Sequence, residues 1–252
     1  MRIQMTRALT VALVASAVAL ALAAAWIWER PETAVDVNGL RDMREELEGV
    51  EKILWIGPHA DDEVYVAGLL YCAHLEGKDC VIVAFQADEA REAVNKMSAD
   101  LLGCRYVYAS QYPRASPREK VRAIPLGESP DLVVTFHPET GFRMSKTHAA
   151  VGKLVTEIIS AENLDIGLFY VLNNDPTLEE LLGGADGARP THYLDLNFLV
   201  SAKGGNLWEV WLADICLYSD LVPAAGAVCE DVNGVRTRML RYEFYLEYNP
   251  SG

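Results

Sequence analysis

Short apolar runs alternate with longer stretches of helical periodicity from about residue 51 onward. Each run is bounded by glycine, proline or polar residues, which is typical of buried strands. Strands that alternate with helices form βαβ units, whose sheets are parallel and are covered by helices on both faces. The sequence therefore predicts a Rossmann-like three-layer α/β fold with a mostly parallel sheet. The predicted strands are residues 53–56, 79–85, 105–109, 131–136 and 166–171, and the predicted helices are 63–76, 88–102, 117–123 and 147–160.

The remaining segments of the domain follow weaker patterns. Residues 173–190 are rich in Asn, Asp, Gly and Pro, which predicts a long loop that could border a pocket. A strand is expected at 192–198 and a helix at 207–221, whereas 241–248 could be either a strand or a helix. Residues 37–50 carry apolar side chains at helical spacing and predict an amphipathic helix that leads into the domain.

The N-terminal segment contains 21 residues without a charge, from Ala8 to Trp28. A helix of this length can cross a hydrocarbon core of about 30 Å. Two interpretations stay open. A cleaved signal peptide would use small residues at 21–25, whereas an uncleaved anchor would end in interfacial aromatic residues, as Trp26 and Trp28 do. We favour the anchor. Basic residues precede the run and acidic residues follow it, so the domain should lie outside the cytoplasm, or be secreted if the segment is cleaved.

The length and the charge limit the domain organisation and the partners. A chain of 252 residues has room for a terminal segment and one domain of about 200 residues. We expect a signal anchor or signal peptide at 1–30, a linker and leading helix at 31–50, and one α/β domain at 51–252. The net charge of −14 argues against nucleic acid as a partner.

The cysteines carry limited information. The chain has five, and no Cys-x-x-Cys pair that would form a thiolate zinc knuckle. The odd number leaves at least one free thiol in a monomer. A bridge between Cys216 and Cys229 could form if the domain faces an oxidising compartment.

Metal-ligating side chains follow the first predicted strand, 53–56, and open the first helix. His59 and Asp62 are three residues apart and can point into one crevice, at the sheet edge where open α/β proteins bind ligands. Imidazole and carboxylate suit a catalytic zinc, which takes about three protein ligands and leaves a position open for water. Asp61 faces another direction and is free to act as a base toward zinc-activated water. Acidic residues are also favoured at a helix N-terminus by the helix dipole alone.

A second such segment follows the fourth predicted strand, 131–136, and again opens a helix. It would bring His148 to the crevice of His59 and Asp62, and these three ligands leave positions for water and a substrate oxygen. A lone histidine at a helix start is more often a capping or surface group. The matching first segment favours a metal site instead.

At these residues the chain resembles a known family. Residues 58–63, Pro-His-Ala-Asp-Asp-Glu, are similar to the Pro-His-Pro-Asp-Asp-Glu signature of the zinc-dependent N-acetylglucosaminyl de-N-acetylases. That family includes the phosphatidylinositol-glycan (PIG-L) de-N-acetylases and their bacterial LmbE-like relatives. Ala60 replaces the proline of the signature and removes no ligand. The second segment resembles the family's second motif, a strand ending in Thr-Phe, then a glycine, then His-x-x-His. The resemblance runs loosely from residue 51 to about 248.

The resemblance implies a zinc hydrolase that removes an acetyl group from an N-acetylated amino sugar of the N-acetylglucosamine type, from a glycoconjugate or from a related small amide. Zinc would be held by His59, Asp62 and His148, and Asp61 would be the general base. The final histidine of the second motif falls on His148. The earlier one, which steadies charge on the substrate carbonyl, falls on Ser145.

The part of the motif that would stabilise charge on the substrate carbonyl is therefore altered. His137, Arg143 and Ser145 are the candidates for stabilising the oxyanion. Arg143 occupies a place where many bacterial members have an aromatic residue. The alternative function is a membrane-tethered, catalytically weakened metal- or sugar-binding domain of the same fold. A nucleotide site is disfavoured, because the sequence has no Gly-x-Gly-x-x-Gly motif and no P-loop.

Overall fold

The computed structural model describes most of the residues from 37 to 248, and those from Asn38 onward belong to one compact unit. The predicted N-terminal segment, the loop at 173–189 and Arg143 lie outside the described residues. Within the described part, none of the helices combines the length and hydropathy that a bilayer crossing requires. The span predicted from Ala8 to Trp28 therefore stays a prediction. The described ranges are 37–86, 89–108, 116–123, 127–141, 145–172, 190–196, 199–200, 205–222, 225–226, 229 and 242–248.

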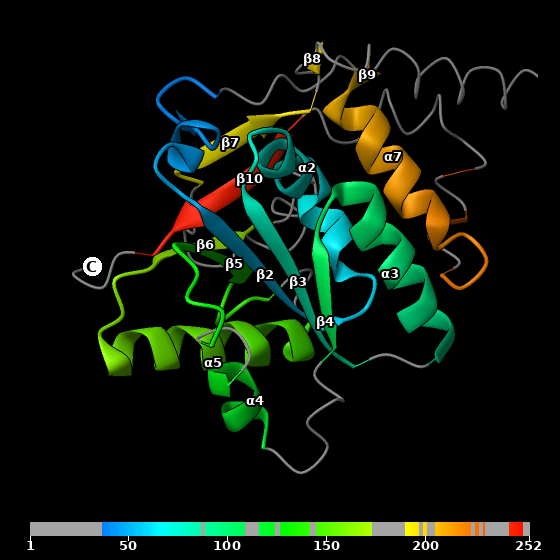
Figure 1. Cartoon of the computed structure of the whole chain (residues 1–252). Coiled ribbons are helices and arrows are strands. Elements are labelled where there is room, and N and C mark those ends of the chain that lie inside the picture. Colours follow the sequence, from blue (N-terminus) through cyan, green and yellow to red (C-terminus); the bar gives the residue numbers. More distant parts are fainter. Residues whose placement is uncertain are drawn as a thin grey trace, which may run out of the picture. The chain divides into compact units, whose positions relative to one another are not determined.

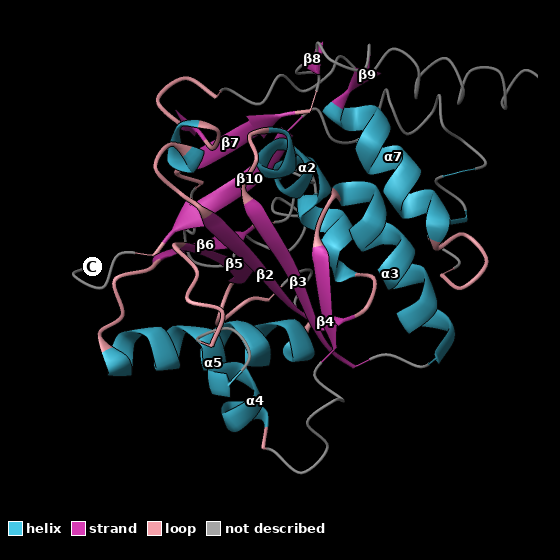
Figure 2. Ribbon diagram, viewed as in Figure 1, coloured by secondary structure: helices cyan, strands magenta, loops and turns pink. Residues whose placement is uncertain are grey.

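An eight-stranded sheet forms the frame of this unit (Figure 1 and Figure 2). Its strand order is β1-β7-β10-β6-β5-β2-β3-β4. All neighbouring strands are parallel except β10, which is antiparallel to both β6 and β7. The predicted mostly parallel sheet is thus confirmed. The strands are β1 (Arg41–Asp42), β2 (Lys52–His59), β3 (Asp79–Gln86), β4 (Arg105–Tyr108), β5 (Leu132–Phe136), β6 (Gly167–Val171), β7 (His192–Asp195) and β10 (Tyr242–Glu247).

Helices cover both faces of the sheet, which gives the predicted three layers (Figure 1). On one face lie α2 (Ala67–Leu75), α3 (Glu89–Leu102) and α7 (Leu207–Leu217). On the other lie α4 (Pro117–Ala123) and α5 (Lys146–Glu162). A separate two-stranded sheet joins β8 (Leu199–Val200) and β9 (Gly205–Asn206).

The central strand β2 shows why the apolar runs are continuous. Ile53 and Trp55 pack into the core under α2 and α7, whereas Leu54 and Ile56 pack into the core under α5. Successive side chains of a strand point to opposite faces, so a strand that is covered on both sides needs apolar residues at every position. The apolar run ends at Ile56, but β2 continues to His59 and so carries the chain to the site.

Residues 37–50 do not form the predicted amphipathic helix, and this prediction is wrong. The segment contains β1 and a single 3-10 turn, η1 (Glu45–Leu47). Gly39 and Gly49 have φ angles of 89° and 80°, which interrupt a helix at both ends of the segment. Between them, β1 pairs with β7, a partner that the local pattern does not reveal.

Two further segments were predicted less completely. The helix expected at 63–76 begins with a 3-10 helix, η2 (Asp62–Val66), before α2. The segment at 241–248, which could have been a strand or a helix, contains β10.

Candidate metal centre

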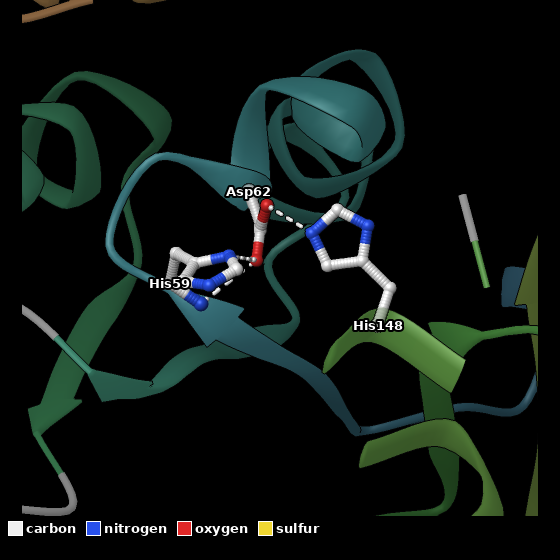
Figure 3. Close-up of side chains that lie close together, drawn as sticks. All are labelled: His59, Asp62 and His148. Carbon is white, nitrogen blue, oxygen red and sulfur yellow. Dashed lines mark hydrogen bonds and ion pairs between the residues drawn. The ribbon is translucent and has the colours of Figure 1, made fainter. Parts of the chain in front are cut away.

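Three side chains from two distant segments converge at the carboxyl ends of β2 and β5 (Figure 3). His59 ends β2, Asp62 opens η2, and His148 lies in the first turn of α5. One potential ligand atom from each residue lies within 4.8 Å of the other two. The structure therefore brings together the three residues that the sequence nominated as metal ligands.

The carboxylate of Asp62 joins the two imidazole rings. Its Oδ2 lies 3.3 Å from His59 Nδ1, and its Oδ1 lies 3.2 Å from His148 Nε2. The backbone N–H of His59 also donates to Oδ2, at 2.8 Å. Because each oxygen contacts a different ring, the carboxylate fixes the separation of the two histidines.

The charges of the cluster favour an ionised carboxylate. Burial raises the pKa of Asp62, but hydrogen bonds from His148 and His59 outweigh this effect and the pKa is lowered overall. The same contact with Asp62 raises the pKa of His59, against the effect of its partial burial. A metal ligand must be deprotonated, so Asp62 is already in the required state and His59 binds a metal in competition with a proton.

Close packing of α5 against β5 orients His148. The His148 ring stacks on Phe136, with ring centroids 4.2 Å apart and an interplanar angle of 11°. One turn later, a Cβ on Gly152 would lie 1.9 Å from the carbonyl oxygen of Phe136. Glycine is therefore required where the helix crosses the end of the strand, and this close approach directs His148 toward Asp62.

Asp61 lies beside the cluster and is not part of it. Its Oδ2 is 3.7 Å from Nη1 of Arg91, which belongs to the first turn of α3. Burial raises the pKa of Asp61, and the charge of Asp62 adds to this, while Arg91 and His59 oppose it. Sequence reasoning missed Arg91. The available signal was its position just after β3, at the same edge of the sheet as the other site residues.

Of the three candidates for oxyanion stabilisation, the two that the structure describes, His137 and Ser145, are placed less favourably. His137 follows β5 but stays outside the cluster, and its Nδ1 accepts the backbone N–H groups of Glu139 and Thr140, both at 3.3 Å. Burial lowers the pKa of His137. Ser145 is the N-cap residue of α5, and its hydroxyl lies 3.2 Å from that of Thr147. Arg143 lies outside the described residues.

The donor set fits a catalytic zinc. Two imidazole nitrogens and one carboxylate oxygen are the number and type of ligands that catalytic zinc sites use. Two ligand atoms that are each about 2.0 Å from a tetrahedral zinc lie about 3.3 Å apart. The distance from Asp62 Oδ1 to His148 Nε2, 3.2 Å, has this size, whereas the contact with His59 is made by the other oxygen, Oδ2.

Comparisons with known proteins show the fold. No protein-family model matches the sequence, and no curated protein has a significant sequence match. A deacetylase of the teicoplanin biosynthetic pathway superposes with a TM-score of 0.55 at 12% identity, over 79% of this chain and 99% of that one. 4-Carboxy-2-hydroxymuconate hydratase from Pseudomonas putida superposes with a TM-score of 0.54 at 15% identity, over 79% of this chain and 97% of that one. N,N'-diacetylchitobiose deacetylase from Pyrococcus horikoshii superposes with a TM-score of 0.52 at 18% identity, over 82% of this chain and 87% of that one. The two deacetylases are of the LmbE/PIG-L type, so the fold that the resemblance predicted is confirmed.

Proposed function

We propose that this protein is a zinc-dependent hydrolase that removes the acetyl group from an N-acetylated amino sugar, a glycoconjugate or a related small amide. The observation that carries the proposal is the convergence of His59, Asp62 and His148, with Asp61 beside them. The solved deacetylases of the same fold support it. A hydratase shares the fold, so the fold alone does not choose the reaction. The motif at residues 58–63 favours the deacetylase.

The residues of the site have separate tasks. His59, Asp62 and His148 would hold zinc, which supplies a Lewis acid that polarises the amide carbonyl and lowers the pKa of water towards about 7. Asp61 accepts a proton from the water as it adds to the carbonyl carbon. The protonated Asp61 then gives this proton to the leaving amine nitrogen as the C–N bond breaks. Before a metal binds, burial and the charge of Asp62 raise the pKa of Asp61, which favours a proton-accepting role.

A weakened metal- or sugar-binding domain is the second candidate function. Ser145 favours it, because this neutral hydroxyl stands where the family motif has histidine and already contacts Thr147. Hydrogen bonds from charged donors are about twice as strong as those from neutral ones. A protein that holds zinc through His59 and His148 without turnover would fit this reading.

Metal analysis combined with an amide panel tests both functions. We expect one zinc per purified chain, and loss of zinc in His59→Ala and in His148→Ala. Amine release from N-acetylglucosamine derivatives should follow zinc content. His74→Ala is the control, since His74 lies on α2 outside the cluster. Wild-type protein without zinc would contradict the proposal, whereas zinc without turnover on every amide would favour the binding domain.

We infer that the domain lies outside the cytoplasm, either anchored by residues 8–28 or secreted after their cleavage. A disulfide between Cys216 and Cys229, the pair anticipated from the sequence, supports this inference. Such bonds persist mainly in oxidising compartments. Protease added to intact producing cells should digest an anchored domain, and sequencing of the mature N-terminus should find Met1 or the next residue. A start near Trp26 would indicate a signal peptide, and a fully protected domain would contradict the inference.

A further inference from the structure

A buried hydrogen-bond chain joins three elements behind the candidate metal centre. Asn95 on α3 donates from Nδ2 to the hydroxyl of Tyr218 at 2.9 Å. Tyr218, at the end of α7, in turn donates to Oε1 of Glu63 on η2. All three side chains are at most 1% exposed. The proposed reaction uses none of them, so their function needs another explanation.

The chain ends at a residue adjacent to a candidate metal ligand. Asp62 and Glu63 open the five-residue helix η2. A 3-10 helix has three residues per turn, so their side chains diverge by about 120°. Asp62 therefore points to the two histidines, while Glu63 points to Tyr218. A helix this short is not stable by itself, so its orientation depends on its tertiary contacts.

The segment that carries Tyr218 is itself held in place. The disulfide from Cys216 to Cys229 closes the chain around Tyr218. Ala225, inside the closed segment, packs with Tyr218 against Val64, the residue after Glu63. The segment thus contacts two successive residues of η2, one by a hydrogen bond and one by apolar packing.

We propose that Tyr218 is a positioning residue for the metal centre, held by the Cys216–Cys229 disulfide. Through Glu63 it sets the rotation of η2, and the rotation of η2 aims the carboxylate of Asp62 at His59 and His148. This proposal rests on the proposed function, because it takes Asp62 as a metal ligand. Loss of the Tyr218 hydroxyl leaves a buried oxygen of Glu63 without this donor, and a turn of η2 toward water relieves that cost.

Zinc affinity of the full chain, measured by competition with a chromogenic chelator, tests the proposal without an activity assay. We expect Tyr218→Phe to bind zinc about tenfold more weakly, as is usual when groups behind metal ligands are removed. Tyr170→Phe is the matched control. It removes a buried hydroxyl that lies 2.8 Å from Thr156 Oγ1, on the opposite face of the sheet. Its affinity should stay within about twofold of wild type.

A double-mutant cycle separates positioning from general destabilisation. In the Glu63→Gln background, Tyr218→Phe should reduce zinc affinity by a smaller factor than it does in the wild-type background. The effects of two substitutions are not additive when one residue acts through the other. An equal loss of zinc affinity in both backgrounds would overturn the proposal that Tyr218 acts through Glu63. If zinc affinity fell in proportion to thermal stability in both Tyr218→Phe and Tyr170→Phe, general destabilisation would explain the loss and the proposal would also be overturned.

A variant with both Cys216→Ser and Cys229→Ser provides a second measurement if Tyr218→Phe does not fold. This variant removes the disulfide without thiol reductants, which would themselves bind zinc. It leaves Asp61 and both histidines unchanged. We expect it to weaken zinc affinity as well. If wild-type protein binds zinc and both variants bind it within about twofold of wild type, the positioning proposal is overturned and the proposed function stands. If wild-type protein binds no zinc, the proposed function fails, and this inference fails with it.

Discussion

Asp61 and Asp62 are adjacent carboxylates with opposite surroundings. Hydrogen bonds from two histidines lower the pKa of Asp62 despite its burial. Burial and the neighbouring charge of Asp62 raise the pKa of Asp61. Environments that push two carboxyl pKa values apart are typical of acid and base pairs with different roles. This difference supports Asp62 as the ligand and Asp61 as the base.

Replacement of Asp61 by asparagine should separate these roles. An amide cannot accept the proton, so turnover should fall about 10²–10⁴-fold while zinc is retained. Both quantities can be measured on the same preparation, as kcat and as bound metal. Asp100→Asn, on the exposed side of α3, is the control and should leave kcat unchanged. Full activity of Asp61→Asn would mean that another group is the base.

The residue that stabilises the charge on the substrate oxygen can be identified by substitutions at two neighbouring positions. If Ser145 faces the substrate oxygen, Ser145→His should raise kcat without changing zinc affinity, since loss of one oxyanion donor costs about 10²–10³ in rate. If the always-charged Arg143 already fills this role, Arg143→Ala should be the damaging change. When neither variant alters kcat of an active wild type, His137→Ala is the next measurement.

The sequence predicted the residues that lie at strand ends and missed those that depend on tertiary packing. His59, Asp62 and His148 lie together as predicted because the segments that carry them follow the carboxyl ends of β2 and β5, and a parallel sheet brings these ends to one edge. Arg91 and Tyr218 were not found, because their partners are set by how α3 and α7 pack. No local pattern carries that information.

At the scale of elements, the site depends on how closely α5 approaches β5. Gly152→Ala would place a Cβ 1.9 Å from the carbonyl oxygen of Phe136, a backbone atom that cannot move away alone. We expect a loss of about 1–3 kcal/mol in the free energy of unfolding, together with weaker zinc binding, as α5 and His148 shift. Urea unfolding and zinc titration measure the two effects.

Gly167→Ala on β6 is the control for this contact. Its Cβ would lie 3.4 Å from Leu132 Cδ1, an ordinary packing distance, so stability should change by less than about 1 kcal/mol. Equal stability of the two variants would show that α5 and β5 do not approach as described.

Local patterns predicted most elements well and failed where pairing is distant. The run at 79–85 corresponds to β3 (Asp79–Gln86), since a strand covered on both faces has no polar interruption. The segment at 37–50 was misread because its pairing partner, β7, lies far along the chain. The segment at 241–248 stayed ambiguous because apolar spacing alone does not separate a short strand from a helix.

For the whole domain, Glu243 makes stability depend on pH. This fully buried carboxyl on β10 accepts the backbone N–H groups of Gly68 and Leu69 and the hydroxyl of Tyr245. Burial raises its pKa from 4.5 to about 7, although these hydrogen bonds oppose the effect. Between these values the folded state holds more protons than the unfolded state, so stability falls as pH rises.

Unfolding by urea at pH 5 and at pH 8 should reveal this dependence. The Glu243 contribution is fully present below pH 4.5 and is lost as pH rises through about 7, at a cost of about 3 kcal/mol. Glu243→Gln should therefore have a flatter profile than wild type between pH 5 and pH 8. Glu247→Gln, on the same strand but exposed, should keep the wild-type profile. Identical slopes for wild type and Glu243→Gln would show that Glu243 is not the source.

The position of β10 has a consequence for synthesis. β10 follows every other described strand in the chain, yet it lies between β6 and β7, and β1 joins the sheet only through β7. The frame of the domain therefore cannot close until residues 242–247 have emerged from the ribosome, or from a translocation channel. At 5–20 residues per second, the interval from β1 to β10 is about 10–40 s. Throughout that interval the nascent chain carries strand edges without their partners, and it must be shielded from other chains.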